Sequence, residues 1–140
     1  MTWLAALLVL CCVAGAAWAV RARLLVVTVH GVSMLPTYEP GDRLLVRRVG
    51  LGRVRRGDVV VFSSAASPDP DDPTNGLLVK RAAAVPGDPV PAGIPVDGPV
   101  VPAGSLLVLG DNAARSHDSR TLGYIAADAL IGVVLRPIRN

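Results

Sequence analysis

The sequence contains few cysteines, few aromatic residues and little net charge. Its 140 residues include two cysteines and five aromatic residues, and the formal net charge is +3. Cys11 and Cys12 are adjacent and lie in an apolar run, so they cannot bridge distant elements, and we interpret both as small apolar residues of a membrane helix. Five aromatic side chains are too few for a platform that stacks on nucleic-acid bases.

The distribution of charge also argues against a nucleic-acid partner. Arg21 and Arg23 lie directly after the apolar run, and setting these two aside leaves 12 of the 14 basic residues against 11 acidic ones. That near balance gives no basic face of the kind that binds phosphates. With 51% apolar residues, the chain has room for one compact domain and one anchor.

The first segment of the chain predicts a membrane anchor. Thr2–Val20 contains no charged residue, and as an α-helix it would be about 28 Å long, close to the roughly 30 Å hydrocarbon thickness of a bilayer. We therefore predict a transmembrane helix within residues 1–23. The alternative is a cleaved signal peptide, because Ala17-Trp18-Ala19 has the small-x-small form of a cleavage site. No basic residue precedes the run, however, and it is longer than the usual core of a signal peptide.

Residues 24–140 predict a mainly β domain. Short runs rich in Val, Leu and Ile alternate with Gly, Pro and Asp about every ten residues, which is typical of strands joined by turns. We expect an exposed loop over residues 63–76, and a helical turn only at Ala126–Ile131. The expected strands are Leu24–His30, Arg43–Val49, Val59–Phe62, Leu77–Val85, Ser105–Leu109 and Leu130–Arg136.

Lysine is almost absent from the chain. It has thirteen arginines and a single lysine, Lys80. Arginine keeps its proton in proteins, whereas a buried lysine can lose it, so Lys80 is a candidate for a role that needs a neutral amine. In a strand, Lys80 shares its face with Leu78 and Ala82, and this apolar setting is expected to lower its pKa. The composition alone also fits an ordinary lysine at the edge of a strand.

Ser33 is the serine best placed for attack on a substrate. It lies in Gly31–Thr37, just after a predicted strand, where Gly31 permits a close approach and Pro36 fixes the chain beyond the serine. A serine at such a junction can present its hydroxyl to a cleft and its N–H to a developing oxyanion. A serine in a turn can also simply bond to its own backbone.

The stretch around Ser33 resembles the nucleophile box of type I signal peptidases, in which Ser-Met-x-Pro-Thr surrounds the catalytic serine. Three further segments resemble later boxes of that family, in the same order and spacing. They are Gly41–Val46 with Gly57–Phe62, Val79–Arg81 leading to Pro86–Asp88, and Gly110–Asn112 running to Ser116–Arg120. The resemblance covers roughly residues 28–137. It implies a catalytic domain of coiled antiparallel β-sheets after one N-terminal transmembrane helix.

The resemblance implies a Ser/Lys dyad. Ser33 would attack the scissile carbonyl, and neutral Lys80 would take its proton and later activate water. The backbone N–H of Ser33 would be one oxyanion donor. Some family members add a serine hydroxyl two positions earlier, where this chain has Gly31. We therefore expect the second oxyanion donor to be a backbone group or another residue.

The last box implies residues that support the dyad. Ser116 matches the serine that orients the lysine amine, and Asp118 and Arg120 match a pair that holds that serine in place. His30 and His117 match no functional position of the family, and we expect both to be solvated or structural. The sequence has no metal-ligand cluster or nucleotide-binding motif, so no metal or other cofactor is expected.

The resemblance implies a membrane-anchored serine endopeptidase that removes signal or leader peptides from exported precursors. The substrate would bind as an extended strand and be cut after small residues of the Ala-x-Ala type. Membrane lipid is the second expected partner. The six arginines between Arg43 and Arg56 fit either anionic headgroups or a solvated strand face.

The expected location is the cell membrane, with a single pass and the catalytic domain on the extracytoplasmic side. Arg21 and Arg23 oppose this orientation, because the positive-inside bias favours the cytoplasm for the side that carries them. The sequence leaves the orientation open.

Three other functions remain open at this point. The short domain also fits a maturation protease with a single client, similar to that of nickel superoxide dismutase or one that cleaves a leader peptide. The self-cleaving repressors of the SOS response share the Ser/Lys chemistry, but the sequence shows no DNA-binding segment before this domain. A membrane-tethered binding module without activity is the non-enzyme alternative, and the intact Ser33 and Lys80 argue against it.

Overall fold

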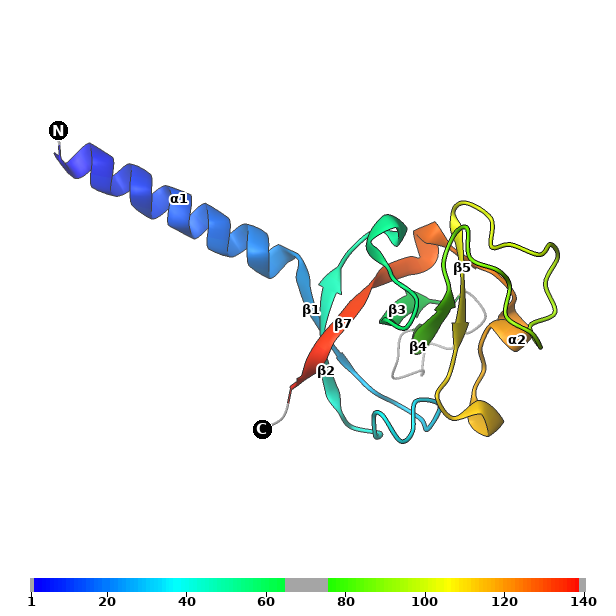
Figure 1. The fold of residues 1–140 in the computed structure, drawn as a ribbon. Coiled ribbons are helices and arrows are strands. Elements are labelled where there is room, and N and C mark those ends of the chain that lie inside the picture. The colour runs from blue at the N-terminus through cyan, green and yellow to red at the C-terminus, as the bar shows by residue number, and fades with distance from the viewer. Residues whose placement is uncertain (1, 65–75, 139–140) are drawn as a thin grey trace.

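The computed structural model describes residues 2–64 and 76–138. The chain forms one long N-terminal helix followed by a β domain (Figure 1). The loop predicted over residues 63–76 falls largely on residues 65–75, which lie outside the described residues. At its two ends, the Ser64 N–H donates to the Gly76 carbonyl at 2.8 Å.

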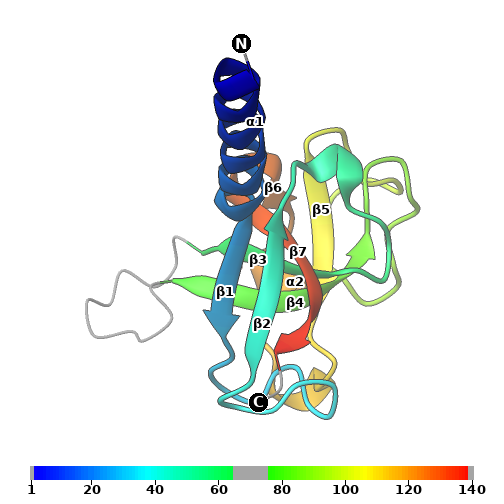
Figure 2. The same cartoon turned by 90° about the vertical axis from the view of Figure 1, so that its left-hand side faces the viewer.

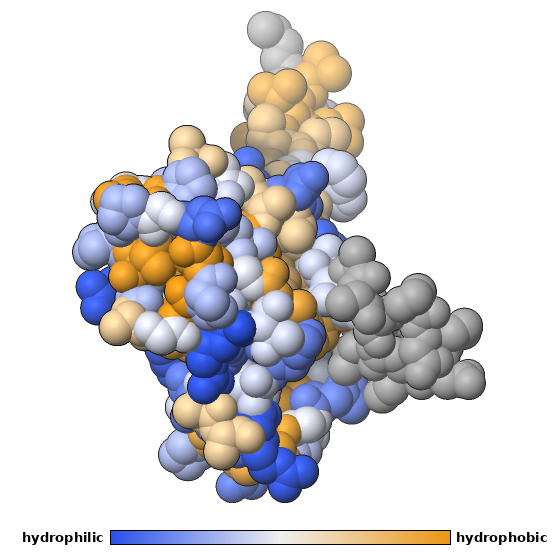
Figure 3. Space-filling view, turned by 90° about the vertical axis from the view of Figure 1, so that its right-hand side faces the viewer, coloured by the Kyte–Doolittle hydropathy of each residue, from blue (hydrophilic) through white to orange (hydrophobic). Residues whose placement is uncertain are grey.

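Helix α1 spans Thr2–Ala22 and stands clear of the β domain (Figure 1). Its segment Trp3–Ala22 is long and apolar enough to cross a membrane, and none of it is buried against the rest of the chain. In Figure 3 the visible surface of the helix is hydrophobic, whereas that of the β domain is mixed. An exposed helix that is apolar on all sides fits a membrane-embedded segment.

The β domain is built on one antiparallel sheet with the strand order β1-β2-β7-β3-β4-β5-β6. The strands are β1 (Leu24–Thr28), β2 (Arg43–Arg48), β3 (Val59–Ser63), β4 (Leu77–Ala84), β5 (Ser105–Leu109), β6 (Ile125–Ala126) and β7 (Leu130–Ile138). Figure 2 shows β1 and β2 running steeply across the direction of β3 and β4, so the sheet curls on itself. The predicted mainly β fold with an N-terminal apolar helix is confirmed.

Strand β3 shows how one sheet supports a core on both faces. The run Val59–Phe62 is buried throughout. Val59 and Val61 pack with apolar residues of β1, β2 and β4, whereas Val60 and Phe62 pack with a second cluster from β4 and β5. Because strand side chains alternate between faces, a continuous apolar run is what a strand buried on both sides requires. This central position of β3 fixes β4, which carries Lys80.

The predicted strands are correctly placed, with small shifts at their ends. Strand β1 ends at Thr28 instead of His30, and β7 continues to Ile138 instead of Arg136. The expectation of a helical turn only at Ala126–Ile131 was wrong. One 3-10 turn does form at Ala127–Ala129, and helical turns also form at Leu51–Arg53, Ala113–Arg115 and Ser119–Leu122 (α2).

Helix α2 and strand β6 were missed because local polar contacts and short pairings define them. The Asp118 carboxylate caps α2 by accepting from the Arg120 N–H. Such a cap leaves no trace in a pattern of apolar periodicity. Strand β6 has two residues and pairs only with β5, so it is too short to show alternation in the sequence.

Candidate active site

Ser33 lies in the turn between β1 and β2. Gly31 adopts φ 78°, a left-handed conformation that glycine accepts without strain and that turns the chain after the strand. The Leu35 N–H donates to the Val32 carbonyl at 3.2 Å. The side chain of Met34, which is 1% exposed, anchors the turn in the core. These contacts hold Ser33 at the rim of the domain, partly accessible to solvent.

Asn112 fastens the turn of Ser33 to the end of β5. Its backbone N–H donates to the Ser33 carbonyl at 2.9 Å, and its side-chain Nδ2 donates to the Val32 carbonyl at 3.0 Å. The N–H of Ser33 itself has no acceptor among the described residues. The two bonds from Asn112 therefore fix the backbone of the serine while leaving its own N–H available to a substrate oxygen.

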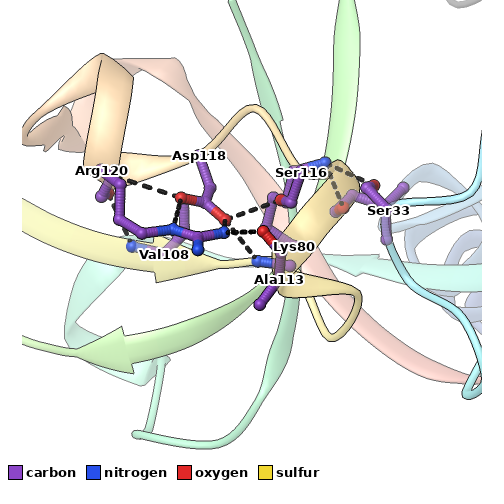
Figure 4. A network of polar contacts seen from close by, with 10 residues as sticks. Ser33, Lys80, Val108, Ala113, Ser116, Asp118 and Arg120 are labelled. Carbon is purple, nitrogen blue, oxygen red and sulfur yellow. Dashed lines mark hydrogen bonds and ion pairs between the residues drawn. The ribbon is translucent and has the colours of Figure 1, made fainter. Parts of the chain in front are cut away.

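Lys80 lies in β4, opposite Val60 of β3, and is 3% exposed. Its Nζ is 2.7 Å from Ser33 Oγ and 3.2 Å from the Val79 carbonyl oxygen. Burial lowers the pKa of Lys80, and the carboxylate of Asp118 opposes this with a smaller effect in the other direction. The fold thus brings together the two residues predicted as a dyad (Figure 4), and it makes the amine easier to deprotonate than that of an exposed lysine.

Asp118 is completely buried, and its carboxylate accepts five hydrogen bonds (Figure 4). Arg120 donates through Nε and Nη2, each at 2.9 Å, and through its backbone N–H at 3.2 Å. The Gly110 N–H donates at 2.9 Å and the Ser116 hydroxyl at 2.6 Å. Burial raises the pKa of Asp118, but the bonds from Arg120, Gly110 and Ser116 outweigh it and hold this pKa well below its usual range. The carboxylate is therefore a permanent negative charge inside the domain.

Ser116 lies between Asp118 and the Ser33–Lys80 pair in Figure 4. Its hydroxyl donates to Asp118, and in residues 2–64 and 76–138 no hydrogen bond joins it to Lys80. Its role in orienting the lysine amine stays a prediction. Gly110 allows the close approach of the two serines, because a Cβ at this position would lie 2.5 Å from Ser116 Cβ and 2.7 Å from the Ser33 carbonyl oxygen.

A second ion pair, which sequence reasoning missed, braces the same region. Arg81 donates to Asp111 through Nε at 2.8 Å and Nη2 at 2.7 Å, and through Nη1 to the Gly57 carbonyl at 2.9 Å. The Thr37 hydroxyl donates to Asp111 at 2.6 Å. The cluster thereby joins the Ser33 turn, β4 and the end of β5. All three side chains lie inside the boxes that the sequence singled out, and that position was the available signal.

A groove of about 820 Å³ leads along β1 to the dyad. It is lined by Leu25–Met34, Leu77–Lys80, Ala114, Arg115 and His117. Strand β1 ends the sheet, so its outer edge has no neighbouring strand in the described part of the chain. Strand β5 pairs with β4 only beyond Lys80. The groove is therefore flanked by two stretches of backbone that lack a strand partner on the groove side.

The two histidines both line this groove. His30 and His117 are exposed, and their expected lack of a catalytic role stays a prediction. Among the described residues, no three His, Cys, Asp or Glu side chains gather as metal ligands do. The polar groups at the centre of the site bond to one another instead: Lys80 bonds to Ser33, and Ser116 bonds to Asp118.

Comparison with known proteins adds an independent line of evidence. The chain matches the family described as "Signal peptidase, peptidase S26" over residues 1–94 and 92–138. It is 36% identical over 124 residues to "Signal peptidase I" of Leptolyngbya laminosa, which covers 71% of this chain and 61% of that protein. It is 29% identical over 143 residues to "Signal peptidase I" of Bacillus caldolyticus, covering 76% and 74% of the two chains. "Signal peptidase IB" of Staphylococcus aureus (strain COL) is 31% identical over 148 residues, covering 76% and 73%.

These similarities confirm the family that the four boxes predicted, and with it the class of serine endopeptidase. The apolar helix α1, together with these relatives, indicates association with a membrane. The functional roles of Ser33, Lys80, Ser116, Asp118 and Arg120 stay predictions. The aligned region spans about three fifths of the Leptolyngbya protein and about three quarters of the other two.

Proposed function

Because the chain belongs to the signal peptidase family, peptidase S26, we propose that it removes signal or leader peptides by means of a Ser33–Lys80 dyad. The observation that carries this proposal is the 2.7 Å distance between Lys80 Nζ and Ser33 Oγ. The amine belongs to the only lysine of the chain, and that lysine is buried where its pKa is lowered. A buried arginine could not serve there, because it would keep its proton.

The proposed reaction has two halves. Ser33 Oγ attacks the scissile carbonyl carbon while its proton passes to neutral Lys80 Nζ, and the ammonium then gives a proton to the departing amine. This leaves an acyl ester on Ser33. In the second half, Lys80 takes a proton from water, the resulting hydroxide attacks the ester, and the proton returns to Ser33 as the acid is released. Lys80 ends each cycle neutral.

The Ser33 N–H is the first oxyanion donor that we propose. It has no acceptor in the described part of the chain. The bond from Asn112 Nδ2 to the Val32 carbonyl holds the peptide plane that carries this N–H, and the bond from the Asn112 N–H to the Ser33 carbonyl holds the next plane. A fixed donor aimed at the developing charge lowers the barrier more than a mobile one. Gly31 leaves no side chain at the position of a second donor, so that donor must be a backbone group or another residue.

We propose that the substrate lies in the groove as an extended strand. The outer edge of β1 and the part of β4 before Arg81 can each donate and accept backbone hydrogen bonds, whatever the side chains of the substrate. The groove wall is mainly aliphatic where β1 and β4 form it. Aliphatic walls support a preference for small apolar residues before the cut, as in Ala-x-Ala.

We propose that α1 is a single transmembrane anchor that holds the domain on the extracytoplasmic side. Its apolar length supports the anchor, and the need to reach exported precursors supports that side. Arg21 and Arg23 favour the opposite orientation. Protease protection in spheroplasts tests this point: an accessible β domain supports the proposal, and a protected one places the domain in the cytoplasm.

The test of the function is cleavage by the full chain in lipid nanodiscs. The substrate is a precursor bearing Ala-x-Ala, and mass spectrometry identifies the cut. Wild type should cut after the second alanine, Ser33→Ala should not cut, and Ser105→Ala should match wild type, because Ser105 makes no side-chain hydrogen bond in the described residues. Equal cleavage by Ser33→Ala and wild type would refute Ser33 as the nucleophile.

The same assay separates the alternative functions. A dedicated maturation protease would leave the general precursor uncut and cleave a single client. An inactive binding module would cleave neither, while still binding a peptide in the groove. Cleavage of several unrelated precursors after small residues would exclude both alternatives.

A further inference from the structure

Arg115 is a cation of the groove that has no ion-pair partner in the described part of the chain. It is exposed and lines the groove, and neither of the two ion pairs of the described residues includes it. Its side chain also has no hydrogen-bond acceptor in that part of the chain. Arg81 and Arg120, by contrast, each hold a carboxylate close to the site. Within the described residues, Arg115 is therefore the one of these three arginines whose side chain has no protein partner.

The backbone around Arg115 is held against the nucleophile turn. The Arg115 N–H donates to the Asn112 carbonyl at 3.0 Å, and Asn112 in turn donates to the Ser33 carbonyl. The next residue, Ser116, packs against Gly110 beside the same carbonyl of Ser33. Arg115 therefore lies at the dyad end of the groove, whereas β1 runs away from Ser33 toward the opposite end.

Among the described residues, the lining of the groove contains basic residues but no carboxylate. It includes Arg115 and Lys80, together with His30 and His117, and no Asp or Glu. The two carboxylates closest in sequence to this end are Asp111 and Asp118, and both are already bonded to arginines. In the described part of the chain, no carboxylate compensates the positive charge of Arg115, and a carboxylate on the substrate is its complementary partner.

We propose that Arg115 makes the enzyme favour substrates with an acidic side chain just after the scissile bond. The inference rests on the peptidase function proposed above and deepens it. Residues before the cut lie along β1 and β4, so residues after the cut pass the turn that carries Arg115. The preference for an acidic over a neutral residue is about two- to fivefold in kcat/KM, the range of an exposed ion pair, and it weakens as salt is added.

The experiment uses three peptides that share an Ala-x-Ala segment and differ only in the next residue, which is Asp, Asn or Lys. Wild type should cleave the Asp peptide best, mainly through a lower KM, because the contact is already made in the bound complex. Arg115→Gln should abolish the preference, and Arg115→Glu should transfer it to the Lys peptide. Arg136→Gln is the matched control, since Arg136 is exposed, lies outside the groove and carries the same charge.

Two outcomes overturn the role of Arg115. One is an unchanged preference in Arg115→Gln, and the other is equal cleavage of the three peptides by wild type at low salt. If no peptide is cleaved, the proposed function fails separately, and binding of the same labelled peptides to Ser33→Ala then decides the matter. Tighter binding of the Asp peptide, lost in Ser33→Ala/Arg115→Gln, would support the role of Arg115, and equal binding of all three would refute it.

Discussion

Replacement of Asp118 by asparagine is expected to destabilise the β domain markedly, although the two side chains have nearly the same size. The carboxylate is completely buried and accepts five hydrogen bonds. An asparagine amide nitrogen at the Oδ2 position would face the donors of Gly110, Ser116 and Arg120. At the Oδ1 position it would face the backbone N–H and Nε of Arg120. In either orientation, at least two donors lose their acceptor.

The magnitude follows from the burial of the two partners. Removing the charge of one partner of a fully buried ion pair costs about 3–5 kcal/mol. The side chain of Arg120 is 35% exposed, so water can solvate its charge after the carboxylate is lost, and this solvation reduces the cost. We therefore expect Asp118→Asn to lower the free energy of unfolding by about 2–3 kcal/mol at neutral pH.

The assay is guanidinium unfolding of the full chain in detergent micelles, followed by the circular dichroism of the β-sheet. Asp128→Asn is the control, because Asp128 is exposed and its carboxylate makes no hydrogen bond in the described residues. The pKa of Asp118 is lowered by the fold, so its stabilising effect is complete above the ordinary carboxyl pKa of about 3.9 and is lost as the pH falls through the folded value. Wild type should therefore lose more stability on acidification than Asp118→Asn. Equal stability of the two asparagine variants at pH 7 would refute the reasoning.

Four further predictions concern the dyad and its surroundings. Lys80→Arg should abolish precursor cleavage as completely as Lys80→Ala, and near-normal cleavage by the arginine variant would overturn the role of Lys80 as proton acceptor. In wild type, kcat/KM should rise with pH and level off below the ordinary pKa of lysine. The reason is that burial lowers the pKa of Lys80 and only the neutral amine acts as a base. A value of kcat/KM that still rises at the ordinary lysine pKa would contradict this. Gly110→Ala should lower the free energy of unfolding by about 1–3 kcal/mol and the rate of cleavage by more than tenfold. The reason is that the new Cβ would displace the Ser33 carbonyl. Wild-type kinetics in this variant would refute the prediction. Asp111→Asn should lower the free energy of unfolding by only about 1 kcal/mol, because the side chain of Arg81 is 36% exposed. It should affect kcat more than KM. An effect on KM alone would argue against a positioning role of Asp111.

The Ser33–Lys80 pair was predictable because four short contiguous segments resemble the boxes of signal peptidases, and the local features of each residue supported that resemblance. Ser33 follows a strand and precedes a proline, and Lys80 is the only lysine in an apolar strand. Each of these features is readable without knowledge of distant contacts. The strands were predictable from local patterns as well, since β3 is a continuous apolar run and β4 buries every second residue from Lys80 to Ala84.

The remaining parts of the site depend on contacts between distant segments. Thr37, Arg81 and Asp111 meet only because the Ser33 turn, β4 and the end of β5 converge. The groove beside β4 exists because β5 pairs with β4 only from Arg81 onward and leaves the start of β4 uncovered. The pairing of β4 with β5 also shifts register between Ala82 and Ala84. No local pattern of residue types encodes such a shift, because register is set by the pairing of whole strands.

The effect of the Asp118 charge on the pKa of Lys80 suggests why Arg120 lies in the site. A buried carboxylate raises the pKa of a nearby lysine, yet this lysine must lose its proton to act as a base. Arg120 bonds to both oxygens of the carboxylate, so its positive charge offsets much of the effect that the negative charge has on Lys80. Asp118 can then hold Ser116 and Gly110 rigidly without keeping Lys80 protonated. In the proposed mechanism, Arg120 therefore helps to keep Lys80 neutral, in addition to holding Asp118 in the turn.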